Sequence, residues 1–81
     1  MIKKDLAISE TGFLFNPLTG SSYSLNTVAM DIVNLLKENK SKDEIQYLIM
    51  ERYEVDETTF ENDYYDFLKL LQQYKLLQNA A

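Results

Sequence analysis

The sequence predicts a small α+β domain that is winged helix-turn-helix-like, with a three-stranded antiparallel sheet followed by three helices. Two observations lead to this prediction. Between residues 4 and 25 apolar side chains recur at every second position, which is typical of strands, and from Asn26 onward they recur at helical spacing. Because a small sheet cannot bury its apolar face alone, it must pack against the helices. The 81 residues suit one domain, 1–81, with a core over about 5–78.

The strands are predicted at residues 6–9, 13–15 and 21–25. The segment 16–20 between the second and third strands contains the strongest turn signal in the chain. Pro17 presets φ for the second position of a turn, and Gly20 takes a positive φ without steric cost. A weaker signal at residues 10–12 separates the first two strands. The pattern therefore predicts two consecutive hairpins.

The first two helices have recognisable ends. Asn26 is a suitable N-cap for the first, and Asn39 ends it in a left-handed conformation, which Asn tolerates better than most residues. Ser41 and Glu44 have the spacing of a capping box at the start of the second, which ends at Tyr53. The apolar faces are formed by Val28, Ala29, Ile32, Leu35 and Leu36 in the first helix and by Ile45, Leu48 and Ile49 in the second.

The third helix is predicted to begin after Asp56 as N-cap, with Val55 and Phe60 spaced as a hydrophobic staple. It is expected to end near residues 76–77. Its core stripe consists of Phe60, Tyr64, Phe67, Leu71 and Tyr74.

The composition argues against catalysis. With no cysteine there are no disulfides, thiolates or cysteine-ligated metals, and with no histidine the usual base near neutral pH is missing. We therefore predict a protein that is not an enzyme and has no catalytic residue, cofactor or metal site. No signal peptide is visible and no apolar run approaches the roughly 20 residues that span a bilayer, so we expect a cytoplasmic protein that does not bind membranes.

The charge argues against nucleic acid. The net charge is −5, and the eight basic residues are scattered, with Arg52 as the one arginine. Binding to phosphates needs clustered basic residues. The alternative function is a winged-helix DNA-binding transcriptional regulator, which shares this architecture. Against it, residues 56–74 contain five acidic residues and one lysine, a net charge of −4 that repels phosphates.

The third predicted strand is a candidate binding edge. Residues 21–25 contain neither Lys nor Pro, the residues that usually prevent pairing at the edge of a sheet. An open edge beside a helix allows a foreign peptide to add as a further strand. Two interpretations stay open: this edge is free, or another part of the chain covers it.

One flank of the third helix is the second half of the candidate site. Tyr65 is rotated by about 100° from Tyr64 on the core stripe. It falls on a line that is part apolar and part polar, and such a line is either a partner groove or a wider core. The line consists of Glu61, Tyr65, Leu68, Lys69 and Gln72.

In this order and spacing, four stretches resemble the PqqD family: residues 19–26, 29–36, 53–56 and 66–77. The resemblance covers roughly residues 5–78. The family often has Trp where this sequence has Ile32-Val33, and Gly where it has Asn39-Lys40. These departures favour a relative that serves a peptide pathway other than pyrroloquinoline quinone synthesis.

The resemblance implies a peptide chaperone, or recognition element, that binds the leader segment of a ribosomally made precursor peptide. It implies delivery of that peptide to a modifying enzyme, typically a radical S-adenosylmethionine (SAM) enzyme whose iron–sulfur clusters this cysteine-free chain cannot ligate. We expect a monomer, or a weak homodimer through a strand edge. Carried over, the resemblance assigns peptide binding to Ser22, Tyr23, Ser24 and Leu25 on the strand and to Glu61, Tyr65, Leu68, Lys69 and Gln72 on the helix.

Overall fold

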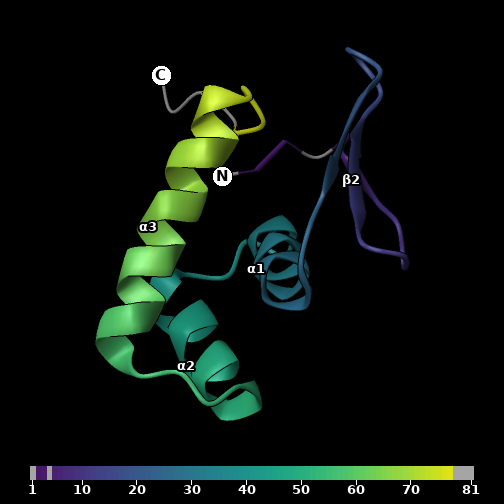
Figure 1. Cartoon of the computed structure of the whole chain (residues 1–81). Coiled ribbons are helices and arrows are strands. Elements are labelled where there is room, and N and C mark those ends of the chain that lie inside the picture. Colours follow the sequence, from purple (N-terminus) through teal and green to yellow (C-terminus); the bar gives the residue numbers. More distant parts are fainter. Residues whose placement is uncertain (1, 4, 78–81) are drawn as a thin grey trace.

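A computed structural model describes residues 2–3 and 5–77 and confirms the predicted order of elements (Figure 1). Residues 1, 4 and 78–81, which include both ends of the predicted domain, lie outside the described residues. Three strands precede three helices, so the α+β class is confirmed. The elements are β1 (Ala7–Ile8), β2 (Phe13–Asn16), β3 (Ser21–Ser24), α1 (Thr27–Lys37), α2 (Lys42–Arg52) and α3 (Glu57–Gln73).

The sheet is antiparallel with β2 in the centre and β3 at one edge. Leu14 of β2 is paired with Tyr23 of β3, and both side chains lie on the inner face of the sheet. The predicted turn is formed at residues 16–20, where the Asn16 carbonyl accepts a hydrogen bond from the Gly20 N–H at 2.8 Å. Gly20 has a φ of 77° there, as the turn requires. This short connection fixes the register of β3 on β2.

All three predicted helix starts are confirmed. The side chains of Asn26, Ser41 and Asp56 each accept a hydrogen bond from the backbone N–H three residues later, at 2.8, 3.2 and 2.7 Å. Glu44 completes the predicted capping box by accepting a bond from the Ser41 N–H at 3.2 Å. Asn39 follows α1 with a φ of 60°, the left-handed conformation expected of it. These contacts depend on near neighbours in sequence, which is why they were predictable.

The end of α3 differs from the prediction. The helix ends at Gln73 rather than near residues 76–77. Lys75 has a φ of 59°, and this left-handed residue turns the chain so that Leu76 enters the core, with 1% of its surface exposed. Leu77 then forms an isolated antiparallel bridge with Ile2, which brings the two ends of the described chain together.

The hydrophobic core lies between the inner face of the sheet and the three helices. No helix within the described residues combines the length and the apolar character needed to cross a membrane. The buried apolar residues are Ile2, Leu6, Leu14, Ile32, Val33, Leu35, Leu36, Ile45, Ile49, Phe60, Tyr64, Leu71 and Leu76.

Candidate functional site

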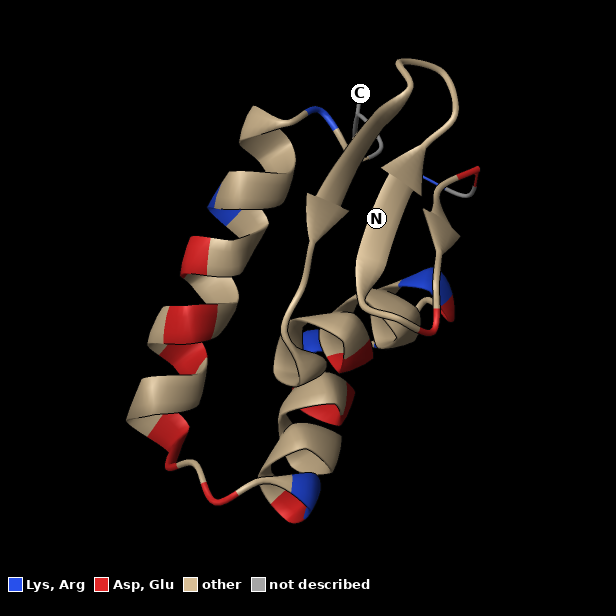
Figure 2. Cartoon of the chain, turned by 45° about the vertical axis from the view of Figure 1, so that its right-hand side comes forward, with Lys and Arg blue, Asp and Glu red and all other residues tan. Residues whose placement is uncertain are grey.

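The outer edge of β3 is unpaired within the described residues. Leu25, just beyond the strand, donates its N–H to the Gly12 carbonyl at 2.7 Å. Because the direction of backbone hydrogen bonding alternates along a strand, the N–H and C=O groups of Ser22 and Ser24 then point away from β2. Figure 2 shows this edge of the sheet facing α3. The arrangement leaves a row of backbone donors and acceptors for another strand.

The described residues of the N-terminal segment do not cover this edge. Ile2 pairs with Leu77, and the N–H of Lys3 donates to the Leu76 carbonyl at 3.0 Å. These contacts hold the described start of the chain against the segment that follows α3. Of the two interpretations that the sequence left open, the structure therefore supports the free edge.

A groove of about 310 Å³, the β3–α3 groove, lies between this edge and α3. Its floor contains the buried side chains of Leu14, Leu71 and Leu76. On the helix side Leu70 is 40% exposed and is therefore free to contact a ligand. The groove is thus apolar and adjoins the unpaired edge. The full lining is Leu14, Ser22, Tyr23, Ser24, Leu25, Phe67, Leu70, Leu71, Tyr74 and Leu76.

An aromatic stack joins the two walls of the β3–α3 groove. The rings of Tyr23 and Tyr74 lie with their centroids 4.5 Å apart and their planes at 21°. Tyr23 projects from the middle of β3, and Tyr74 is the C-cap residue of α3. Such a pair contributes about 0.5–1.5 kcal/mol beyond the area that it buries. The stack therefore holds the strand edge at a fixed position relative to the end of the helix.

The opposite flank of α3 faces α2. Lys42 at the start of α2 forms an ion pair with Glu61 at 2.8 Å, and its Nζ lies 5.6 Å from the centroid of the Tyr65 ring. The hydrogen bond to Glu61 raises the pKa of Lys42 above its ordinary value. Glu61 and Tyr65 on this flank therefore have a partner in α2, while 50% of the Tyr65 surface stays exposed.

The predicted site residues divide between these two flanks. All four strand residues, Ser22, Tyr23, Ser24 and Leu25, line the β3–α3 groove. None of the five predicted helix residues lines the groove. Glu61 and Tyr65 face Lys42 of α2, and Leu68 packs against the core. Lys69 and Gln72 are exposed. The structure does not bring these five residues to the β3–α3 groove, because helical periodicity defines two flanks and does not say which one meets the sheet. Their contact with a peptide stays a prediction.

The helix side of the groove is formed instead by Phe67, Leu70, Leu71 and Tyr74. The sequence pattern places Phe67, Leu71 and Tyr74 on the predicted core stripe, and Leu70 is not among the predicted site residues. The sequence does contain a signal for this groove. The four apolar residues follow one another at spacings of three, one and three, so they form an apolar face that is wider than a single core stripe.

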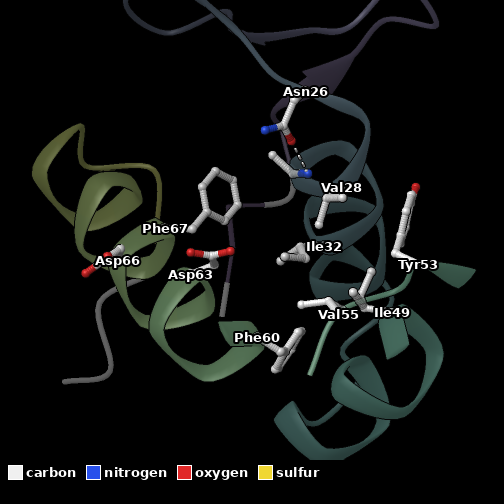
Figure 3. A pocket seen from close by; sticks show the side chains of 11 residues that line it. Asn26, Val28, Ile32, Ile49, Tyr53, Val55, Phe60, Asp63, Asp66 and Phe67 are labelled. Atoms are coloured by element: carbon white, nitrogen blue, oxygen red, sulfur yellow. Dashed lines mark hydrogen bonds between the residues drawn. The ribbon is translucent and has the colours of Figure 1, made fainter. Parts of the chain in front are cut away.

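A second hollow, the α1–α3 pocket, has a volume of about 390 Å³ and was not predicted (Figure 3). Its apolar lining includes Ile32 of α1 and Phe60 of α3, and its two carboxylates are Asp63 and Asp66. Phe67 lines both this pocket and the β3–α3 groove, so the two spaces adjoin. The pocket lies between α1 and α3 because α2 packs against both helices, and no local pattern reveals that arrangement.

Comparisons with known proteins agree with this geometry. The structure is similar to a chain of the solved structure "TbiB1 in Complex with the TbiA(beta) Leader Peptide", with 35% sequence identity, a TM-score of 0.80 and coverage of 94% of this chain and 90% of that chain. A search of curated proteins gives no significant match. The family model for coenzyme PQQ synthesis protein D (PqqD) matches residues 11–77. The chain therefore belongs to the PqqD family.

Proposed function

We propose that this chain recognises the leader segment of a ribosomally made precursor peptide and presents it to a modifying enzyme. The observation that carries the proposal is the unpaired edge of β3 beside an apolar groove. The solved complex of the similar protein TbiB1 contains a leader peptide, which supports the same use of this fold here.

The groove suits a peptide that binds as a fourth strand. The outward backbone groups of Ser22 and Ser24 would form hydrogen bonds with the peptide, each contributing about 1 kcal/mol net. Alternate peptide side chains would enter the groove against Phe67 and Leu70. Two apolar anchors would add about 2 kcal/mol each before the cost of ordering the peptide. The resulting affinity is about micromolar or somewhat better, which permits release to an enzyme.

Chemistry would take place on the partner, and this chain would supply binding alone. The resemblance to the family favours a radical SAM enzyme as that partner, in the cytoplasm where precursor peptides are made. The DNA-binding alternative gains no support, because acidic residues occupy α3, the counterpart of a recognition helix (Figure 2).

A displayed library of random 15-residue peptides tests the proposal without knowledge of the natural precursor. Selected peptides are expected to carry apolar residues at alternate positions. In NMR spectra they should protect the amides of Ser22 and Ser24 from hydrogen exchange. Failure to select any peptide, or protection confined to α2, would overturn the proposal. Light scattering on the free protein shows whether a second copy occupies the edge instead.

A further inference from the structure

We propose that the α1–α3 pocket is a second subsite for the same bound peptide and that it takes a basic side chain, Lys or Arg. This inference rests on the proposed function and adds a specificity to it. The β3–α3 groove would select apolar residues, whereas this pocket would select one positive charge at a fixed distance along the peptide.

The shape of the pocket suits a long aliphatic stem. Its inner surface is apolar: Ile32, Ile49 and Phe60 are each at most 3% exposed, and the half-buried Val28 and Val55 extend it outward. Figure 3 shows these side chains arranged around one space between α1 and α3. The methylene groups of Lys or Arg bury well along such a surface while the charged end stays near water.

The negative charges around the pocket favour a positive charge at the end of that aliphatic stem. Asp63 extends from α3 toward the space, and Asp66 lies on the outer side of the same helix (Figure 3). None of the described residues that line the pocket is Lys or Arg, and within residues 2–3 and 5–77 neither carboxylate forms an ion pair. The nearby Arg52 is instead paired with Asp31, at 3.6 Å. An apolar lining with unpaired negative charge at its rim complements an aliphatic cation.

One peptide can reach both spaces. Asp63, Phe67, Leu70 and Tyr74 follow one another at spacings of four, three and four, so they lie on one flank of α3. At about 1.5 Å per helical residue, Asp63 and Tyr74 are separated by roughly 16 Å along the axis. An extended peptide covers that distance in about five residues. The basic residue is therefore expected about four to six positions from the apolar residue that packs beside Tyr74.

The peptide library tests this inference through a charge swap. Wild-type protein should enrich Lys or Arg at one position, four to six residues from an apolar anchor. Asp63→Lys should enrich Asp or Glu at that position and keep the apolar anchors. The matched control is Glu51→Lys, which makes the same change in charge at an exposed site of α2 outside the pocket, and it should retain the basic preference.

A selected peptide then gives the size of the effect. Replacing its basic residue by norleucine should weaken binding to the wild-type protein about three- to tenfold, and by less than about twofold for Asp63→Asn. An apolar motif without a basic position, or a basic preference that survives Asp63→Lys, would overturn the second subsite and leave the proposed function intact. Failure to enrich any motif would overturn the proposed function itself.

Discussion

The two flanks of α3 arise from the same helical turns and differ in what they contact. Toward α2, Glu61 and Tyr65 contact Lys42 of the same chain. Toward β3, Phe67 and Leu70 line a groove beside backbone groups that have no partner within the described chain. Glu61 and Tyr65 on the first flank therefore have a partner within the chain, although Tyr65 is 50% exposed, whereas the second flank is apolar and lies next to an open strand. The comparison shows that exposed apolar side chains indicate a peptide-binding surface when they lie beside backbone groups without hydrogen-bond partners.

The largest expected effect comes from placing a charge on the groove flank. Leu70→Glu should weaken binding of a selected peptide by about 30-fold or more, because an apolar contact of about 2 kcal/mol is lost and a carboxylate is forced against apolar groups. Titration calorimetry measures the change, and circular dichroism verifies that the helices are retained.

The matched control places the same charge on the other flank. Tyr65→Glu should leave the affinity within about twofold, because Tyr65 faces α2. An equal loss of binding in both variants would erase the distinction between the flanks and would support the peptide contacts predicted from the sequence for Tyr65 and its neighbours.

A smaller effect is expected from the strand edge. Ser24→Pro removes one outward N–H, and the loss of one backbone hydrogen bond of about 1 kcal/mol should weaken peptide binding about fivefold. Ser24→Ala keeps the N–H and removes the hydroxyl group, so its affinity should match the wild type. If Ser24→Ala loses as much peptide affinity as Ser24→Pro, the peptide does not pair with the backbone of β3.

The smallest effect concerns the α2 flank. Glu61 raises the pKa of Lys42 above 10.5, so the stabilisation from this pair is present below that pH and is lost as the pH rises through the pKa of the folded state. Lys42→Met should remove this alkaline component from the free energy of unfolding, measured by urea titration between pH 8 and pH 11. Peptide affinity at pH 7 should not change. Weaker peptide binding by Lys42→Met would show that the α2 flank of α3 contributes to the peptide site.

The sequence could predict features that depend on neighbouring residues. The N-caps Asn26, Ser41 and Asp56 form bonds three residues away. The absence of Lys and Pro indicated that β3 could pair with a further strand, but the sequence left open whether another part of the chain covers its edge. The orientation of α3 could not be predicted, because it depends on where β3 and α2 pack around the helix. The early end of α3 at Gln73 depends on a left-handed Lys75, a conformation that lysine seldom favours.

The stack of Tyr23 on Tyr74 has a consequence for the entropy of association. β3 is held by β2 on one side and by the last turn of α3 through these rings, so its backbone is already ordered before a ligand arrives. The loss of conformational freedom on binding then falls on the incoming peptide alone. A peptide made rigid in an extended form, for example by macrocyclisation, should therefore gain affinity almost entirely through a slower dissociation rate.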